Sequence, residues 1–309
     1  MGTYRIVSFD GGGVRGVLSA RLLDRLLEDS GDLIEKSDLI AGCSAGSYIA
    51  LGLADGRTTK EIVQLLEESA SEIFGNPNWL PYIEPRYSND RLIEFVDRVF
   101  GDKKLAELQK RVVVPSFSVD DEKNGHWRPL FFHNFPGSET GDVYVKDVAL
   151  ASSAAPTYFP SYKKMIDGGV IANNPSTIGV AFAVSDWGGH QNLEDIAVLS
   201  VGTGFFPYQI TQDTSKWGDL QWLGLPLFYS PDSPHNPSEP IIDVLFDGVS
   251  TADSDLSRML VRDRYFRLNP TLPTLVNLDD YAKIPDLLKL ANATDLTKAK
   301  AFIETIFLA

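Results

Sequence analysis

Cysteine is almost absent from the chain: Cys43 is the single one among 309 residues, so no disulfide can form within it. A chain without disulfides suits a reducing compartment. No apolar run is long enough to span a bilayer, and the first residues lack the apolar core of a signal peptide. We therefore expect a cytoplasmic protein whose contact with membranes is limited to their surface.

Positive charge is also scarce. The 28 Lys and Arg residues are outnumbered by 42 Asp and Glu residues, and the formal net charge is −14. An acidic surface repels nucleic-acid phosphates and is not attracted to anionic lipids, so we expect no nucleic-acid partner. Any contact with lipid must use apolar surface. No His or Cys residues are spaced as metal ligands, so we expect no metal and no other cofactor.

The residues that are present alternate between strand and helix patterns. Residues 4–9 form an apolar strand pattern, residues 17–28 carry leucines at helical spacing, residues 38–41 form a second strand, and a second helix covers about 45–54. Strands that alternate with helices are typical of an α/β fold with a mostly parallel sheet and helices on both faces. Further helices are predicted at 58–74, 89–100, 145–154 and 175–186, and further strands at 112–119, 129–133, 165–166 and 196–201.

The amino-acid composition of the sequence changes after residue 204. Residues 205–240 are rich in Pro and aromatic side chains, and residues 241–309 are mainly helical with one strand near 265–268. No linker separates the two parts. We therefore predict a single domain over 1–309, with a catalytic core at 4–204 and a cap- or lid-like extension at 205–309.

The first candidate for chemistry is a G-x-S-x-G pattern, GCSAG at residues 42–46. It stands between a strand and a helix, so the chain must reverse in a sharp turn that exposes the Ser44 hydroxyl, and the helix N-terminus favours negative charge beside it. The pattern predicts Ser44 as a nucleophile; the alternative is a tight turn with an inert serine. Cys43 is interpreted as a small buried filler under this turn.

The second candidate is the glycine-rich stretch DGGGVRG at residues 10–16, whose backbone N–H groups can face one anion. Gly11, Gly13 and Gly16 fit a dinucleotide-binding G-x-G-x-x-G, but that motif expects an acidic residue at the end of the next strand. Here the next strand leads to Ser44 instead. We therefore favour an oxyanion hole for acyl transfer, and a purely structural glycine turn is the remaining alternative.

The third candidate is Asp167, which ends a short strand and precedes Gly168 and Gly169. Strand ends of parallel sheets collect active-site groups, although a turn or capping role is commoner for an Asp-Gly pair. Asn173 and Asn174 could orient Asp167, but a turn before the following proline is the preferred interpretation.

Taken together, these motifs resemble the patatin-like phospholipase family over residues 4–204. The matching stretches are DGGGVRG at 10–16, GCSAG at 42–46, ASSAAPTYFP at 151–160, DGG at 167–169 and SVGTG at 200–204. The resemblance implies a three-layer α/β/α fold. It also implies a serine lipid acyl hydrolase of the phospholipase A or lysophospholipase type, acting on lipid or fatty-acyl esters without a cofactor.

The resemblance further implies a role for each motif residue. Ser44 is expected to be the nucleophile and Asp167 the base of a dyad that works through an acyl-enzyme. The oxyanion hole is assigned to Gly11, Gly12 and Gly13, and the supporting positions are Arg15, Gly16, Gly42, Gly46, Gly168 and Gly169. Because an ordinary aspartate, with a pKa of about 3.9, is a weak base at neutral pH, the scheme needs a raised pKa, a strong oxyanion hole, or both.

Other functions compete with this hypothesis. An α/β-hydrolase with a Ser–Asp–His triad needs a histidine after the aspartate, and His190 and His235 are the two candidates, both in loop-like segments; His126 and His133 precede Asp167. A non-catalytic dinucleotide- or acyl-binding protein is a further alternative. An acyltransferase that uses the same acyl-enzyme also stays open.

A dense apolar stretch lies in the extension. It consists of Trp217, Leu220, Trp222, Leu223, Leu225, Leu227 and Phe228. Packing inside a cap is the favoured interpretation. The alternative is a lid or a membrane-contacting surface that admits lipid.

Overall fold

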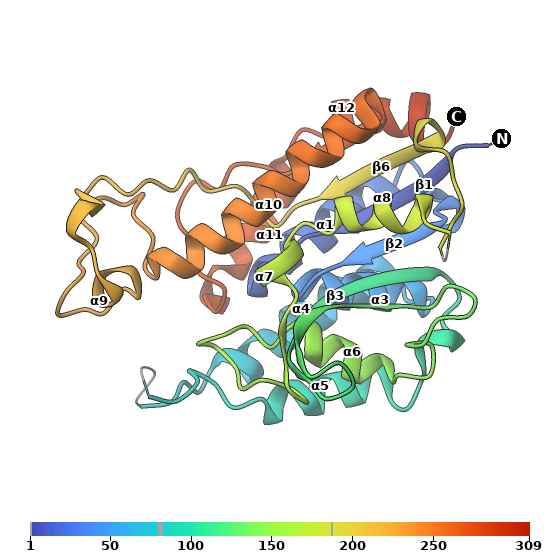
Figure 1. Ribbon diagram of the computed structural model, residues 1–309. Helices are drawn as coiled ribbons and strands as arrows, with labels where there is room; N and C mark the ends of the chain where they lie inside the picture. Colours follow the sequence, from blue (N-terminus) through green and yellow to red (C-terminus); the bar gives the residue numbers. More distant parts are fainter. Residues whose placement is uncertain (1, 80–82, 187) are drawn as a thin grey trace.

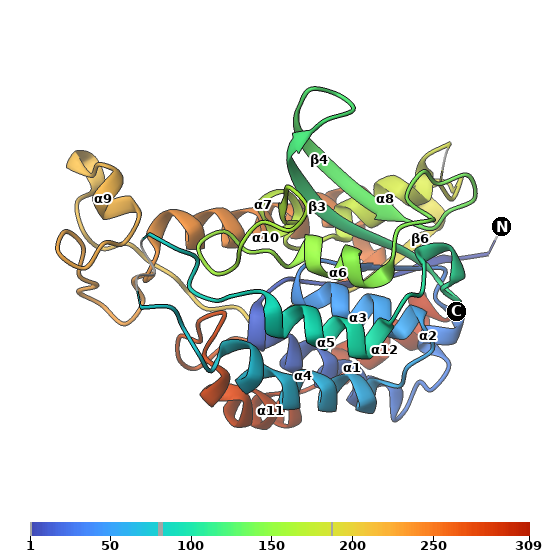
Figure 2. The same cartoon turned by 90° about the horizontal axis from the view of Figure 1, so that it is seen from below.

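The computed structural model describes residues 2–79, 83–186 and 188–309. Within them, a mixed and mostly parallel seven-stranded sheet is covered by helices on both faces (Figures 1 and 2). Six strands follow the order β4-β3-β2-β1-β6-β7, and β5 pairs with β3. The strands are β1 Tyr4–Phe9, β2 Leu39–Gly42, β3 Arg111–Asp121, β4 His126–His133, β5 Met165–Asp167, β6 Ile196–Val201 and β7 Tyr265–Leu268.

Strand β1 lies at the centre of the sheet. It runs parallel to β2 on one side and to β6 on the other, and β3 and β7 continue the parallel set outward. Strands β4 and β5 both pair antiparallel with β3. The carboxyl ends of β1, β2 and β6 therefore meet at one edge, where ligands bind in open α/β sheets.

Helices form the two outer layers. They are α1 Gly16–Leu27, α2 Leu33–Lys36, α3 Ala45–Ala54, α4 Thr59–Phe74, α5 Asp90–Phe100, α6 Val145–Ser152, α7 Gly169–Ala172, α8 Ser176–Val184, α9 Asp219–Trp222, α10 Pro240–Val261, α11 Ile284–Ala293 and α12 Thr297–Phe302. Figure 2 shows α1, α3, α4 and α11 on one side of the sheet and α7, α8 and α10 on the other.

Alternate residues of β1 enter different cores. Ile6 packs in a cluster with Val180 of α8, whereas Val7 packs with Leu22 of α1 on the opposite face. Because both faces of the central strands are buried, apolar residues such as Ile6 and Val7 follow one another in them instead of strictly alternating with polar ones. The predicted α/β fold with a mostly parallel sheet is confirmed.

Most predicted elements form within a few residues of the expected bounds, and the differences are local. The helix predicted at 58–74 is α4, and a capping box of Thr58 and Glu61 stands at its start. Strand β4 begins at His126 rather than at residue 129, because its pairing with β3 extends to Asp121. Strand β5, for which the sequence predicted no direction, is antiparallel to β3.

The last third of the chain contributes to this architecture in two ways. Strand β7 joins the edge of the main sheet, and the fully buried Phe307 belongs to the same core as α1. The segment 205–239 begins in the main core, where Phe206 is buried, and its part around α9 projects away from the sheet beyond the N-terminal end of α10 (Figure 1). In the described ranges, no helix is long and apolar enough to cross a membrane.

Candidate active site

Ser44 stands on a sharp turn between β2 and α3. Its backbone has φ 50° and ψ −122°, a conformation that non-glycine residues rarely adopt. A Cβ atom at Gly42 or at Gly46 would lie 2.3 Å from a neighbouring backbone oxygen, so only glycines let the turn close this tightly. The Ser44 N–H donates to Ser152 Oγ at 3.0 Å. The predicted nucleophile elbow is therefore present in the backbone geometry.

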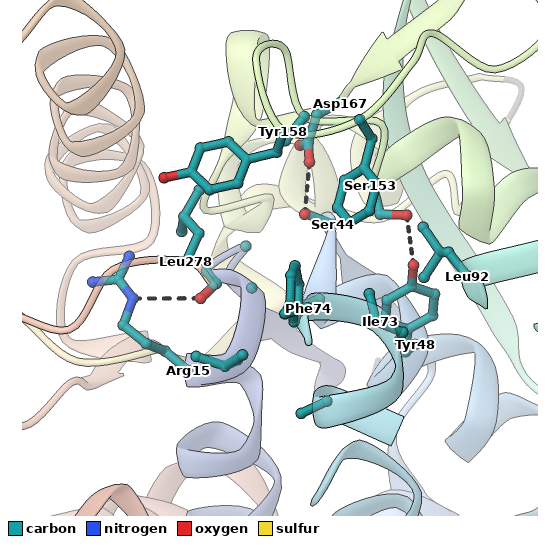
Figure 3. A pocket seen from close by; sticks show the side chains of 18 of the residues that line it. Arg15, Ser44, Tyr48, Ile73, Phe74, Leu92, Ser153, Tyr158, Asp167 and Leu278 are labelled. Carbon is teal, nitrogen blue, oxygen red and sulfur yellow. Dashed lines mark hydrogen bonds between the residues drawn. The ribbon is translucent and has the colours of Figure 1, made fainter. Parts of the chain in front are cut away.

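Asp167 accepts a hydrogen bond from the hydroxyl on this turn. Ser44 Oγ donates to Asp167 Oδ2 at 2.7 Å (Figure 3). The Gly169 N–H donates to Asp167 Oδ1, also at 2.7 Å. The Asp167 side chain is almost completely buried, and burial raises its pKa to about 6, although the hydrogen bonds from Ser44 and Gly169 act to lower it. The carboxylate is therefore a stronger proton acceptor than an ordinary aspartate and is still mainly ionised at neutral pH.

The glycine loop lies beside Ser44, but its three amides are not equivalent. The Gly11 N–H already donates to Asn173 O at 2.9 Å. The Gly12 and Gly13 N–H groups have no hydrogen-bond partner in the described part of the chain, and both residues line the same cavity as Ser44. The role expected for Gly11 is thus revised, because its amide fixes the loop instead of facing the cavity.

Several contacts hold the loop in place. Gly13 has a φ of +56°, and a Cβ there would lie 2.0 Å from Leu278 O, which also accepts the Val14 N–H at 2.8 Å. Thr203 Oγ1 donates to Gly11 O at 2.9 Å, and Arg15 Nε donates to Gly12 O at 3.4 Å. Arg15 therefore braces the loop from the Gly12 carbonyl, which suits a supporting position.

The remaining supporting glycines lie where neighbouring elements approach closely. Gly16 faces Ala45 at the start of α3, Gly168 faces the Pro115 backbone of β3, and Gly169 faces the ring of Phe246 on α10. These contacts let the elbow, the aspartate and the loop meet at one edge of the sheet.

A mainly apolar cavity of about 80 Å³ opens beside Ser44. Its apolar lining comes from α3, α4, α5 and the segment before β5, and includes Tyr48, Leu66, Ile73, Phe74, Leu92, Phe95, Tyr158 and Phe159 (Figure 3). One end is closed by a 2.5 Å hydrogen bond between Tyr48 Oη and Ser153 Oγ. Such a lining suits a hydrocarbon chain better than a charged ligand.

None of the four histidines, all within the described ranges, lines this cavity. His190 is exposed and has Asp186 3.9 Å away. His235 stacks on Phe206, and its Nδ1 lies 3.1 Å from Pro207 O. A Ser–Asp–His triad therefore has no histidine at Ser44.

Two further expectations concern neighbours of Ser44 and Asp167. Cys43 is fully buried, and burial raises the pKa of its thiol well above the usual value, so it stays protonated as a filler. Asn174 Oδ1 accepts the Ser176 N–H at 3.2 Å, which is the turn interpretation. Asn173 acts through its backbone on Gly11.

Sequence reasoning missed an ion pair behind the glycine loop. Arg267 of β7 donates through Nη1 to Asp10 Oδ1 at 2.6 Å and through Nη2 to Asp10 Oδ2. The two residues are 257 positions apart, and no local motif marks Arg267.

The apolar stretch of the extension divides into packed and exposed parts. Trp217 makes edge-to-face contacts with Trp222 at 5.1 Å and with Tyr229 at 5.4 Å between ring centroids. Leu227 and Phe228, in contrast, are 92% and 52% exposed. Packing within the extension therefore accounts for the tryptophans but not for Leu227 and Phe228.

Comparison with known proteins identifies the family. Residues 7–179 match the family described as Patatin-like phospholipase. The CotR protein of Bacillus subtilis strain 168 is 38% identical over 318 residues, covering 98% of both chains, and Protein teg of Priestia megaterium is 37% identical over 318 residues, covering 98% of this chain and 99% of its own. A cGAMP-activated phospholipase of Escherichia coli strain TW11681 is 33% identical over 248 residues, covering 71% of this chain and 67% of its own. The chain therefore belongs to the patatin-like phospholipase family.

Proposed function

We propose that the protein is a serine lipid acyl hydrolase of the phospholipase A or lysophospholipase type, with Ser44 and Asp167 as its catalytic dyad. The observation that carries the proposal is the 2.7 Å hydrogen bond from Ser44 Oγ to a buried carboxylate, at the edge of an apolar cavity. The Gly12 and Gly13 residues, whose N–H groups are unpaired among the residues that the structure describes, line the same cavity. These observations support an assignment of Ser44 as nucleophile, Asp167 as base, the two amides as oxyanion donors and the cavity as the acyl site.

The proposed reaction has two halves. Ser44 Oγ attacks the carbonyl carbon of the ester while its proton passes to Asp167, and the negative oxygen that forms is stabilised by the Gly12 and Gly13 N–H groups. The carbon–oxygen bond to the alcohol then breaks, and the alcohol leaves with the proton from Asp167. Water attacks the acyl-Ser44 ester with Asp167 again as base, and the fatty acid is released.

Two features supply the rate in this scheme. The raised pKa of Asp167, about 6, brings the base nearer to neutral pH, where general-base catalysis is most effective. Loss of one oxyanion donor typically costs about 3 kcal/mol, or roughly a hundredfold in kcat, so the Gly12 and Gly13 amides contribute on a scale comparable to the dyad.

We further infer that the enzyme reaches lipid by transient contact with a membrane surface through the projecting segment. Leu227 and Phe228 expose large apolar side chains there. The net charge of −14 gives no attraction to anionic lipids, so apolar contact is the force available.

The test is hydrolysis of a lipid panel that contains a phospholipid, a lysophospholipid, a galactolipid and a neutral ester. Wild type should cleave at least one of them, and Ser44→Ala and Asp167→Asn should each lose roughly a thousandfold or more in kcat. Wild type, but not Ser44→Ala, should react covalently with a fluorophosphonate, and the adduct should map to Ser44 by mass spectrometry.

Matched controls separate the dyad from its alternatives. Ser71→Ala and Asp263→Asn alter exposed residues of the same types and should keep wild-type activity. His190→Ala and His235→Ala should also remain fully active. Substantial activity in Ser44→Ala or Asp167→Asn, or loss of activity in a histidine variant, would overturn the dyad.

A further inference from the structure

A buried ion pair lies directly behind the proposed oxyanion hole. Asp10 directly follows β1 and precedes Gly11. Its carboxylate accepts hydrogen bonds from both terminal nitrogens of the Arg267 guanidinium. The Arg267 and Asp10 side chains are only 12% and 3% exposed. Ser250 Oγ of α10 donates to Asp10 Oδ2 at 3.0 Å, and Arg267 also donates to Ser200 Oγ at 2.8 Å. The carboxylate is thus fixed by two charged and one neutral hydrogen bond.

Asp10 connects this pair to both halves of the site. Its N–H donates to Val201 O at 3.2 Å, and its own carbonyl oxygen would lie 2.6 Å from a Cβ placed at Gly46. The next three residues along the chain are the glycines of the loop. A shift of the Asp10 side chain would therefore move the loop amides relative to Ser44.

The charge of Asp10 also bears on the reaction. In a buried environment, an unneutralised carboxylate one residue before the loop would oppose a negative charge on the substrate oxygen. Among the described residues, Arg267 is the cation within 4.0 Å of Asp10. Burial acts to lower the pKa of the Arg267 guanidinium, but attraction by Asp10 raises it above its usual value, so the guanidinium stays charged.

We propose that Arg267 is a positioning residue of the oxyanion hole, which clamps Asp10 behind the glycine loop and cancels its charge. The inference rests on the proposed hydrolase function and assigns part of that function to β7, outside residues 7–179. Arg267 acts through Asp10 on the Gly12 and Gly13 amides. Its effect therefore belongs to the transition state rather than to binding of the acyl chain.

The experiment compares full-length variants on a soluble short-chain ester. Arg267→Gln should lower kcat by roughly 10- to 100-fold with KM within about twofold of wild type, because the oxyanion loses support while the acyl cavity is unchanged. Arg267→Lys keeps the charge but not the two-pronged contact, so its loss should be smaller. The double variant Asp10→Asn with Arg267→Gln should recover about tenfold in kcat over Arg267→Gln, because no uncancelled carboxylate remains.

A second readout isolates the oxyanion. A trifluoromethyl ketone forms a tetrahedral adduct with a catalytic serine, and its affinity should fall in Arg267→Gln by the same factor as kcat/KM. Binding of a fatty acid, which forms no adduct, should be unchanged. Asp10→Asn alone should lose less kcat than Arg267→Gln, since the charge it leaves behind the loop is positive and attracts the oxyanion.

Arg264→Gln is the matched structural control. Arg264 lies three residues before Arg267 and donates to Ile196 O and to Thr3 Oγ1, without contact to Asp10. Its removal should lower the melting temperature but leave kcat and ketone affinity at wild-type values. If Arg267→Gln does not fold, the Arg267→Lys, Asp10→Asn and double variants carry the same comparison.

The outcomes are distinguishable. If the double variant is no better than Arg267→Gln, or if a folded Arg267→Gln keeps wild-type kcat, Arg267 has no role in positioning the hole. Equal losses of kcat in Arg264→Gln would reduce Arg267 to a structural residue. If wild type shows no hydrolysis, or Ser44→Ala keeps it, the proposed function itself fails, whatever the arginine variants do.

Discussion

Asp167 combines two properties that oppose each other in most aspartates. It is buried beneath the elbow, where a charge is poorly solvated, and in the proposed dyad it must still be ionised to accept the Ser44 proton. The Gly169 N–H and the Ser44 hydroxyl stabilise the ionised form without cancelling the effect of burial. A base with a pKa between that of an ordinary carboxylate and neutrality is the result.

This environment predicts the dependence of activity on pH. With a pKa of about 6 for Asp167, kcat/KM should rise about tenfold per pH unit below pH 6 and level off above it. The rise follows ionisation of the base, so it should be absent from the residual activity of Asp167→Asn. Initial rates on a soluble ester, measured between pH 4.5 and 9, check this. A profile that is flat through pH 6 in wild type would contradict the assignment of Asp167 as base.

The residues that separate the apolar cavity from a smaller neighbouring one allow a prediction about acyl-chain length. Tyr48, Leu66 and Phe95 line both this cavity and a smaller one of about 10 Å³ behind it. Leu66→Ala removes the side chain between the two spaces, so the preferred acyl chain should lengthen by about two to four carbons, comparable to the carbons removed. A series of p-nitrophenyl esters measures the preference through kcat/KM.

Leu65 provides the control for this experiment. Its side chain lines only the smaller cavity, so Leu65→Ala enlarges that space and leaves the wall intact. The chain-length optimum should therefore stay where wild type has it. An unshifted optimum in Leu66→Ala, or the same shift in both variants, would show that Leu66 does not limit the chain.

At the scale of single residues, the candidate site residues that could be predicted from the sequence are those within short contiguous motifs. Ser44, Asp167 and the glycine loop each belong to a short pattern with its own physical reason. The hydrogen bond that occupies the Gly11 amide depends on the backbone of Asn173, and the Asp10–Arg267 pair depends on the register of β7. Neither leaves a local signal, because both are decided by tertiary contacts.

At the scale of elements, the projecting segment 205–239 differs from the rest of the fold. Most helices bury one face against the sheet, whereas α9 packs chiefly through aromatic contacts of its own segment. Leu227 and Phe228 extend from it with little cover. Exposed apolar side chains on a projecting loop are typical of a surface that meets lipid or another protein.

Replacement of Leu227 tests the lipid interpretation. Leu227→Gln should lower hydrolysis of phospholipid vesicles by about tenfold, since transfer of a leucine side chain into an apolar medium contributes about 1.5–3 kcal/mol. Hydrolysis of a soluble short-chain ester should not change. Met259→Gln serves as control, because Met259 is 73% exposed but lies near the opposite end of α10. Equal effects on vesicles and soluble ester would leave Leu227 without a role at membranes.

The sequence predicted most elements but not all of their partners. Short, mostly apolar stretches identified β1, β2 and β6, because burial on both faces leaves that pattern. The antiparallel pairing of β5 and the place of β7 at the sheet edge have no such pattern, since pairing direction depends on where the chain has travelled in between.

At the scale of the whole molecule, the buried base affects the free energy of unfolding. Asp167 holds its proton up to about pH 6 in the folded protein and only to about 3.8 in an unfolded chain. Between these values the folded state binds more protons, so the free energy of unfolding falls as pH rises. A difference of about two pH units corresponds to on the order of 3 kcal/mol.

Asp167→Asn should therefore be more stable than wild type at pH 7 by up to that amount, and the difference should disappear near pH 4. Urea unfolding of both proteins at the two pH values measures it. Burial also raises the pKa of Asp243 to about 6 and that of Asp253 to about 7, but both residues are present in both proteins and cancel in the comparison. Equal free energies of unfolding of the two proteins at pH 7 would contradict a raised pKa of the buried Asp167.

The central position of β1 has a consequence for synthesis on the ribosome. Ser44 is synthesised early, but β1 has its second neighbouring strand only once β6 has been made. Strand β1 also contacts the end of the chain, because Arg5 Nε donates to the carbonyl oxygen of Phe307. The residues proposed to support the serine are synthesised after it, in the order Asp167, Thr203, Arg267 and Leu278. For most of its translation, a nascent chain therefore contains the proposed nucleophile without the residues that support it. We expect such a chain not to hydrolyse cellular lipids until its C-terminal segment has folded onto the sheet.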